Sequence, residues 1–274
     1  MTPVEIRHAV DPEGARALDS EGLRARFHMS GLFRPGAVKL VYTHYDRMIA
    51  GGAVPDGGKL VLDAVQNTGT ATLLERREMV VANIGEAGTV AAAGVDYALA
   101  NGDMLYLSMG SGPVTFSGKG RFFLISAAAH QAYPSRIVRP DDATRLDLGS
   151  AEEANKRILR QYVHPGVLPT CQIVMGMTTL APGSTWNTMP AHLHDRRSEI
   201  YLYFGLSEKA RVFHMMGEPD QTRHLVMANE EAVVSPSWSI HCGAGTSSYS
   251  FIWAMAGDNV GFTDMDPVAM EDLR

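Results

Sequence analysis

The chain has 274 residues, the length of about two domains of ordinary size. Hydrophobic residues make up 45% and charged residues 20%, a composition typical of a globular protein with an ample core. The formal net charge is −6 and no basic run occurs, which argues against nucleic acid as a partner. Segment 1–26 lacks an apolar core and no apolar run reaches about 18 residues, so we expect neither a signal peptide nor a membrane span. Two cysteines, Cys171 and Cys242, make no disulfide framework and fit a reducing cytoplasm.

The first half of the chain changes its hydrophobic period near residue 38. Before it, residues 12–28 have helical spacing and predict one or two short helical turns broken by Gly14 and Gly22. After it, short apolar runs separated by Gly, Pro and Asp predict strands at 38–42, 59–64, 79–84, 88–92, 104–109 and 122–127. Many short strands at this spacing favour an antiparallel sandwich or barrel.

A second series of strands follows a segment of different composition. Residues 134–169 gather charges at 136–145 and have helical character at 151–162, so we interpret them as a connection. Further strands are predicted at 172–178, 200–204, 210–216, 222–227, 232–235 and 248–256. The sequence therefore predicts an all-β protein of two antiparallel sandwich or barrel lobes with few short helices. The expected division is an N-terminal lobe at 1–140, a connecting segment at 141–168 and a C-terminal lobe at 169–274.

The two strand series look like a diverged internal repeat. The pairs Arg76–Arg77 and Arg196–Arg197 each precede an apolar strand, and each strand ends at a glycine nine residues after the first arginine, Gly85 or Gly205. A shift of 120 residues superposes these marks. We therefore expect the same architecture twice.

The C-terminal copy contains a constellation of metal-ligand type. His192 and His194 stand at alternate positions, which share one face of a strand, and Glu199 opens the next strand. His241 comes 42 residues after Glu199, behind a turn at 236–239, and three intervening strands can bring it back beside the pair. Three imidazoles and one carboxylate suit zinc, iron(II), manganese or nickel. We predict one metal ion in this lobe.

The N-terminal copy lacks such residues. The shift of 120 residues places Thr72, Leu74 and Met79 opposite the first three predicted ligands. No histidine stands at 102–113, where the partner of the fourth would fall. We expect this lobe to bind no metal and to serve packing and assembly.

These motifs resemble those of known families. H-x-H-x4-E followed by P-x-W-S-x-H resembles the two metal motifs of cupins, although Trp238 stands where glycine is usual. Segments 186–190, 213–217, 222–224, 235–241, 74–78, 83–85 and 264–266 are similar to the 5-keto-4-deoxyuronate isomerases of pectin breakdown, so the resemblance covers nearly the whole chain. It implies a bicupin with one Zn²⁺ per chain, commonly a homohexamer. The reaction it implies interconverts 5-dehydro-4-deoxy-D-glucuronate and 3-deoxy-D-glycero-2,5-hexodiulosonate.

Such an aldose–ketose exchange needs a Lewis acid and a base. A metal would polarise the C1 carbonyl and the C2 hydroxyl, and a base would move a proton from C2 to C1 through an enediol. A hydride shift is the rival mechanism. The sequence does not identify the base. His214 and His224 are candidates because imidazole titrates near neutral pH, although each also fits a core or rim histidine.

Other residues near the motifs are candidates for substrate binding. Arg196 and Arg197 could clamp the uronate carboxylate, but the equivalent pair in the copy without ligands points to a structural role. Arg223 lies beside His224, and Trp238 could wall a sugar pocket or simply pack. Three alternative functions stay open: a cupin iron(II) dioxygenase, an isomerase of a neighbouring uronate such as 5-deoxyglucuronate, and a non-enzymatic sugar-sensing or storage cupin.

Overall fold

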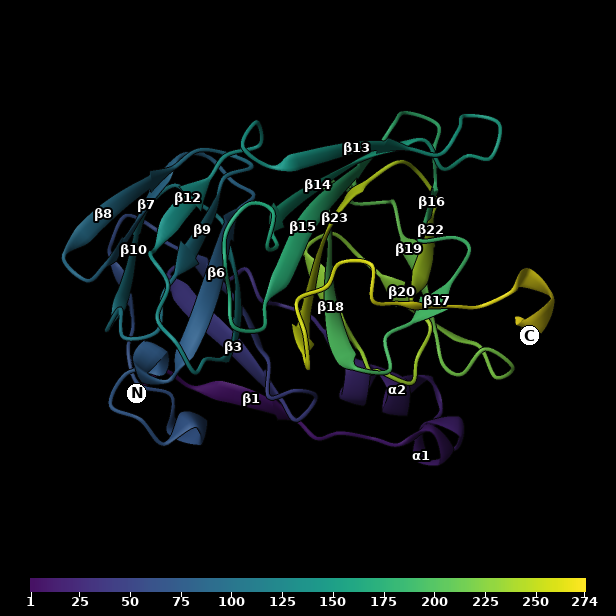
Figure 1. The fold of residues 1–274 in the computed structure, drawn as a ribbon, viewed down its shortest axis with the longest axis horizontal. Coiled ribbons are helices and arrows are strands. Elements are labelled where there is room, and N and C mark those ends of the chain that lie inside the picture. Colours follow the sequence, from purple (N-terminus) through teal and green to yellow (C-terminus); the bar gives the residue numbers. More distant parts are fainter. The chain divides into compact units, whose positions relative to one another are not determined.

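The computed structural model describes residues 1–274, which form strands, turns and a few short helices (Figure 1). The helices are α1 (Pro12–Arg16) and α2 (Ser20–Phe27), and single turns of 3₁₀ helix are η1 (Gln66–Thr68), η2 (Leu73–Glu75) and η3 (Met270–Asp272). Asp11 and Asp19 cap the two α-helices by accepting hydrogen bonds from the backbone N–H groups of Gly14 and Gly22. The predicted helical turns are confirmed. The two glycines do not break them: each lies in the first turn of its helix, where its N–H group donates to the capping aspartate.

The chain divides into two compact units. Unit 1 comprises residues 1–7, 31–144 and 162–173, and unit 2 comprises residues 8–30, 145–161 and 174–274. The strand order of unit 1 is β1-β3-β4-β11-β6-β9-β12 in a seven-stranded sheet and β5-β10-β7-β8 in a four-stranded sheet. Its strands are β1 (Val4–Arg7), β3 (Ala37–Thr43), β4 (Ile49–Val54), β5 (Leu60–Leu62), β6 (Arg77–Asn83), β7 (Gly88–Ala92), β8 (Val95–Leu99), β9 (Met104–Leu107), β10 (Val114–Gly118), β11 (Phe122–Ala128) and β12 (Arg136–Val138).

Unit 2 has the same kind of sheets. The order is β13-β14-β15-β23-β18-β21-β2 in a seven-stranded sheet, β16-β22-β19-β20 in a four-stranded sheet and β17-β24 in a two-stranded sheet. Its strands are β2 (His28–Met29), β13 (Thr144–Leu148), β14 (Arg157–Val163), β15 (Val174–Leu180), β16 (Trp186–Asn187), β17 (His192–Leu193), β18 (Arg197–Phe204), β19 (Val212–Met216), β20 (Arg223–Met227), β21 (Glu231–Ser235), β22 (Cys242–Gly245), β23 (Ser250–Gly257) and β24 (Asp266–Pro267). The all-β prediction is confirmed.

The observed units differ from the lobes that we predicted. Residues 8–30 belong to unit 2 rather than to an N-terminal lobe at 1–140, because β2 pairs with β21 and Arg24 donates a hydrogen bond to the carbonyl of Val226. The helix expected at 151–162 is wrong. Residues 151–154 form a turn, and β14 then lies between β13 and β15. Ile158, Tyr162 and Val163 favour a strand, and sheet pairing outweighs the weak helical pattern.

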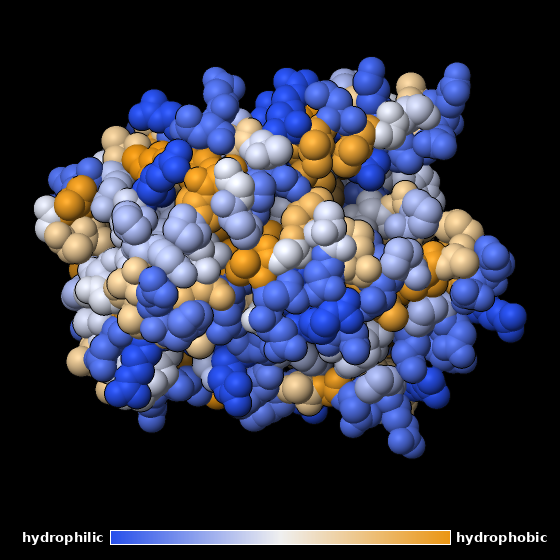
Figure 2. Space-filling view, in the orientation of Figure 1, coloured by the Kyte–Doolittle hydropathy of each residue, from blue (hydrophilic) through white to orange (hydrophobic).

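The interiors of the two units differ in chemistry. The core of unit 1 is an apolar cluster that includes Leu74, Met79, Leu107 and Phe122. Both units also bury polar side chains: they include Arg77, Glu78 and Asn83 in unit 1, and Asn187, His194, Arg197, Glu199, His214 and His241 in unit 2. Only unit 2 buries imidazoles beside a carboxylate, so its interior is where a functional site is expected. On the visible face, hydrophilic residues predominate and hydrophobic ones form small patches (Figure 2). No helix is both long and apolar enough to span a membrane.

Candidate metal centre

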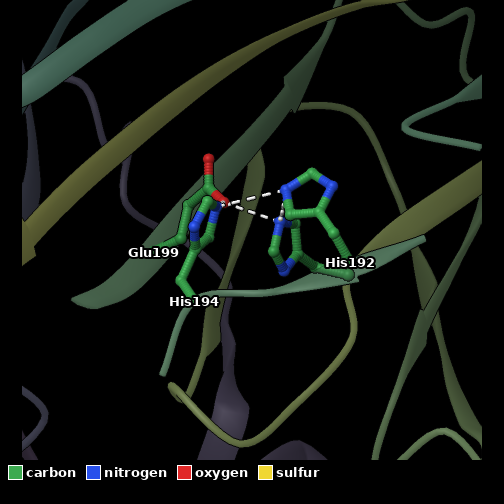
Figure 3. Close-up of side chains that lie close together, drawn as sticks. His192, His194 and Glu199 are labelled. Atoms are coloured by element: carbon green, nitrogen blue, oxygen red, sulfur yellow. Dashed lines mark hydrogen bonds and ion pairs between the residues drawn. The ribbon is translucent and has the colours of Figure 1, made fainter. Parts of the chain in front are cut away.

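Four side chains from three parts of unit 2 meet at one point. His192 lies on β17 and His194 directly follows that strand, so their rings project from the same face. Glu199 is the third residue of β18, between Ser235 of β21 and Met255 of β23. His241 immediately precedes β22. Figure 3 shows the side chains of His192, His194 and Glu199 pointing toward one another.

The spacing of the four ligand-type atoms suits one ion. His192 Nε2 lies 3.2 Å from His194 Nε2 and 3.0 Å from His241 Nε2. Glu199 Oε2 lies 3.3 Å from His194 Nε2 and 2.8 Å from His241 Nε2, and all four atoms lie within 4.8 Å of one another. An ion held about 2.1 Å from each atom would space neighbouring ligands about 3.0–3.4 Å apart. These residues therefore fit a divalent metal ion.

Burial and charge agree with that fit. Glu199 and His241 are 3% and 1% exposed. Burial opposes ionisation of Glu199, but His241 and His194 outweigh it and hold the pKa of its carboxyl well below the ordinary value. Burial, followed by the neighbouring imidazoles, lowers the pKa of His192 to about 3. A neutral imidazole and an ionised carboxylate are the protonation states that bind metal.

A backbone carbonyl orients one of the imidazoles. His194 Nδ1 lies 3.1 Å from the carbonyl oxygen of Asp264. Arg197 Nη2 lies 3.4 Å from the same Nδ1, but its shorter hydrogen bond goes to the Asp264 carbonyl. Because a carbonyl oxygen can only accept and its contact with Nδ1 is the closer one, Nδ1 carries the hydrogen and Nε2 keeps its lone pair toward the cluster. The tautomer of His194 is therefore set by a segment far along the chain.

A cavity of about 310 Å³ opens beside the cluster. His192, His194 and Glu199 form one part of its wall, and the rest is mostly apolar, contributed by Leu148, Leu159, Met189, Pro190, Phe251, Trp253, Met255, Phe262 and Met265. Its other polar side chains are Thr178, Thr188, Tyr201 and Arg157. Burial and then Glu199 raise the pKa of Tyr201 well above its ordinary value, so its hydroxyl stays protonated. Such a cavity has the size and the few convergent polar groups of a small-molecule site.

Arg157 is the only basic side chain other than histidine on the cavity wall, and we did not predict it from the sequence. It lies at the start of β14, where Leu159 shares its face of the strand and also lines the cavity. Its Nη1 donates to the carbonyl of Asn155 at 2.8 Å, and no carboxylate lies within ion-pair distance. Burial lowers the pKa of its guanidinium. A partly buried guanidinium without an anionic partner suits an anionic ligand.

The arginine pair beside the motif does not line the cavity. Arg196 forms ion pairs with Asp264 at 2.5 Å and with Asp266 at 3.1 Å. Arg197 is buried and donates to the carbonyls of Gly261 and Asp264. Their guanidinium groups are occupied by the protein itself, so the structure does not support the substrate contacts that we predicted for them.

The other predicted site residues also lie off the cavity wall. Arg223 donates to the carbonyls of Arg16 and Leu18, and Trp238 donates to the carbonyl of Val10. His224 is exposed on β20, with its ring beside Phe213. His214 is fully buried, with Nδ1 2.8 Å from the hydroxyl of Tyr203 and Nε2 without a partner. None of these side chains lines the cavity, so the structure supports neither the predicted catalytic histidines nor the predicted sugar wall.

The paired antiparallel sheets and the H-x-H-x4-E and histidine motifs, which converge in one unit only, define a cupin with two lobes. The family model described as KduI/IolB family matches residues 31–270. The chain therefore belongs to the KduI/IolB family.

Full-length relatives are named as isomerases. The chain is 64% identical to a 4-deoxy-L-threo-5-hexosulose-uronate ketol-isomerase of Cereibacter sphaeroides, with 100% of both chains covered. It is 54% identical to the protein of that name from Agrobacterium fabrum, again over 100% of both. A third protein of that name, from Shouchella clausii, is 49% identical, with 99% of this chain and all of the relative covered.

Solved structures share the fold at low identity. An IolB-like protein from Salmonella typhimurium superposes with a TM-score of 0.67 at 14% identity, covering 81% of this chain and 86% of that one. An oxalate decarboxylase from Lactobacillus farciminis has a TM-score of 0.54 at 11% identity, covering 81% and 79%. At these identities the likeness shows the cupin fold alone.

Proposed function

We propose that this chain is a metal-dependent ketol-isomerase that converts 5-dehydro-4-deoxy-D-glucuronate to 3-deoxy-D-glycero-2,5-hexodiulosonate. One observation carries the proposal: a cluster of three histidines and a glutamate opens onto a cavity of about 310 Å³ whose wall includes one guanidinium without an ion-pair partner. A six-carbon sugar acid has one carboxylate for that guanidinium and vicinal oxygens for the cluster. Full-length identity of 64% to a protein named for this reaction supports the substrate class.

His192, His194, Glu199 and His241 would hold the metal, and we propose one Zn²⁺ per chain. Three neutral imidazoles and a carboxylate are a donor set that zinc commonly takes, without thiolates. When bound, the ion would supply Lewis acidity to the carbonyl and hydroxyl oxygens of the sugar. The proposal extends to the setting implied by the resemblance: a cytoplasmic homohexamer that acts in pectin and uronate degradation.

The residues of the chain would orient the substrate. Arg157 would pair with the uronate carboxylate and so fix which end of the sugar faces the ligand cluster. The hydroxyl of Tyr201, 3.1 Å from that of Thr188, would donate a hydrogen bond to a substrate oxygen. Trp253 and Phe251 would exclude water from the reacting carbons, which strengthens the electrostatic interactions inside the cavity. A side chain at position 176 would collide with Trp253, so Gly176 gives that ring its place.

The direct test is an isomerisation assay on the purified chain with the ketouronate, with and without chelator. We expect turnover that is lost after chelation and restored by Zn²⁺, together with about one bound ion per chain by elemental analysis. Oxygen uptake with bound iron would support the dioxygenase alternative instead. A zinc-loaded chain without turnover of the ketouronate would contradict the proposed function.

A second candidate reaction is isomerisation of 5-deoxyglucuronate, because the matching family description covers both KduI and IolB proteins. Sequence identity favours the first reaction, since the IolB-like structure is only 14% identical. The ratio of kcat/KM for the two substrates decides between them, and we expect it to favour the ketouronate.

Arg157 can be tested independently. Charge-assisted hydrogen bonds contribute about 1.5–3 kcal/mol, so Arg157→Gln is expected to lower kcat/KM by roughly 10-fold to 100-fold, mainly through KM. Arg160→Gln is the matched control, because residue 160 lies on the same strand and does not line the cavity. Equal kcat/KM for the two variants would remove Arg157 from the substrate site.

A further inference from the structure

The last 17 residues of the chain, 258–274, run along the metal cluster and are called the C-terminal strap below. The strap begins after β23, where the N–H of Asp258 donates to the carbonyl of Arg196 at 3.0 Å. Its strand β24 pairs with β17, so Pro267 lies opposite His192. Its end is fastened by Arg274, whose N–H donates to the carbonyl of Pro219 at 2.9 Å. In Figure 1 this segment is the yellow stretch that passes β18 and β17 before the C-terminus.

The strap supplies parts of the site. The carbonyl of Asp264 lies 3.1 Å from His194 Nδ1 and also accepts a hydrogen bond from Arg197. Phe262 and Met265, on either side of Asp264, line the cavity. The orientation of His194 and part of the cavity wall therefore depend on where residues 262–265 lie.

Ion pairs outside the cavity fasten this part of the strap. Arg196 Nε lies 2.8 Å and 3.0 Å from the two carboxylate oxygens of Asp264, and Arg196 Nη2 lies 2.5 Å from Asp264 Oδ1 and 3.1 Å from both oxygens of Asp266. Asn259 Nδ2 donates to the second oxygen of Asp264. The hydrogen bonds from Arg196 and Asn259 hold the pKa of Asp264 well below its ordinary value, so the carboxylate is ionised near neutral pH.

The repeat shows that this clamp is particular to the unit with the ligand cluster. Arg76 stands 120 residues before Arg196 and precedes the equivalent strand, β6. Its side chain is 76% exposed, and its ion-pair partner is the adjacent Glu75 at 3.9 Å. The arginine is present in both units, but it clamps a distant segment only where there is an imidazole to orient.

We propose that Arg196 is a positioning residue of the metal centre: by clamping Asp264 and Asp266 it holds the C-terminal strap so that the Asp264 carbonyl keeps His194 Nε2 aimed at the ion. The inference rests on the metal centre of the proposed function. Partners that orient a ligating histidine typically change metal affinity by about 10-fold to 100-fold. An exposed ion pair contributes little to folding, so loss of the clamp affects the metal far more than the fold.

The test is zinc affinity, measured by chelator competition, and zinc release into excess chelator, both without substrate. We expect Arg196→Gln and Asp264→Asn to weaken affinity and to speed release by about 10-fold or more. Arg145→Gln is the matched control, because Arg145 forms an exposed two-pronged ion pair with Asp147, at 3.0 Å and 2.8 Å, away from the strap. The control should stay within about two-fold of the parent protein, well below the effect expected of the clamp variants.

A salt series gives a second readout that a general loss of stability would not mimic. Raising nitrate from about 0.05 to 0.5 M screens exposed charges, so release from the parent protein and from Arg145→Gln should accelerate. Release from Arg196→Gln should already be fast and nearly independent of salt. If Arg196→Gln does not fold, Asp264→Asn carries the same test, because it removes one charge with little change of shape.

The outcomes separate this inference from the proposed function. Folded clamp variants that bind and release zinc as the parent protein does would overturn the role of Arg196. A parent protein that binds no divalent ion would overturn it together with the metal centre. A parent protein that binds zinc but does not turn over the ketouronate would overturn the isomerase function and leave the clamp standing.

Discussion

The two units have equivalent strand orders, but an apolar cluster fills unit 1 where unit 2 holds a cluster of ligand-type side chains. Strand β6 lies between β11 and β9, as β18 lies between β23 and β21. Met79 is the third residue of β6 and Glu199 the third of β18. The barrel therefore folds without the ligand-type side chains, because Leu74 and Met79 stand at the equivalent positions of unit 1. A metal centre is a local substitution on a scaffold that also folds around leucine and methionine.

The arginines of the repeat show what the scaffold itself requires. Arg77 and Arg197 are both buried at the start of their strands. Arg77 donates to Ser126 and to the carbonyl of Arg47, and Arg197 donates to carbonyls of the C-terminal strap. Burial lowers the pKa of Arg77 to about 10. A guanidinium kept in both units, with the protein's own oxygens as partners, serves the architecture rather than the substrate.

The largest effect should come from removing the histidine pair in unit 2. His192→Ala combined with His194→Ala leaves two of four ligands, so bound metal should fall from about one ion per chain to near zero. Turnover should fall by about 1,000-fold or more, because the Lewis acid is lost. Thr72→Ala at the equivalent position of unit 1 is the control and should retain both. Unchanged metal content in the double variant would show that the ion, if any, lies elsewhere.

Removing His241 should have the next largest effect. The other three ligands lie within eight residues of one another, and His241 closes the site from the position before β22, far along the chain. His241→Ala should fold and keep some metal, but a displacement of the ion by about 1 Å can lower the rate on the order of 100-fold. Turnover and metal content should be compared with His130→Ala, which changes an exposed histidine of unit 1. Near-parental turnover of His241→Ala at full metal loading would exclude His241 from the site.

Two separate variants, Met79→Glu and Glu199→Met, should show how the free energy of unfolding depends on the residue at this equivalent position of the two units. Met79→Glu buries a carboxyl in the apolar cluster of unit 1 without a partner, which should cost about 3 kcal/mol or more. Glu199→Met removes a buried carboxylate, so the metal-free protein should be unchanged or more stable while metal binding is lost. Thermal unfolding of the metal-free proteins measures both. Equal destabilisation by the two variants would mean that the interior of unit 2 needs its carboxylate for folding.

The sequence predicted what depends on short-range patterns. The alternation of apolar and polar residues predicted most strands, and the spacing of His192, His194 and Glu199 predicted the candidate cluster. Alternate positions on a strand share a face whatever the tertiary structure, so this inference needed no model of the barrel.

What the sequence did not predict depends on contacts between distant segments. The pairing of β2 with β21 joins residues about 200 positions apart and leaves no local signal. Arg157 reaches the cavity only because β14 joins the sheet beside β15, and the same segment has a helical pattern. Arg196 and Arg197 were candidates for substrate binding because they lie near the ligands in sequence, but their guanidinium groups pair with the protein itself, in line with the structural role that the repeat indicated. Substrate contacts follow from tertiary placement, and ligand motifs follow from local geometry.

The smallest expected effect concerns the pH dependence of the free energy of unfolding, to which a buried histidine of unit 2, His214, should contribute. Burial, and then the nearby His241, lower the pKa of His214 to about 3. The unfolded chain titrates this imidazole near about 6.5, so between pH 6.5 and 3 the unfolded state binds a proton that the folded state does not. Stability from this residue is therefore complete above about pH 6.5 and is lost as the pH falls, by up to about 2 kcal/mol between pH 6.5 and 5.

Replacing His214 should remove that part of the pH dependence. Urea unfolding of the metal-free parent protein and of His214→Gln should be measured at pH 7.5, 6.5 and 5. The variant should lose less stability than the parent between pH 6.5 and 5, and the two should run in parallel above pH 6.5. His224→Gln, which changes an exposed histidine on the neighbouring strand β20, should keep the parental dependence. If the free energy of unfolding depends on pH identically in all three proteins, His214 binds protons equally in the folded and unfolded states. Water would then have to reach the His214 side chain through the barrel.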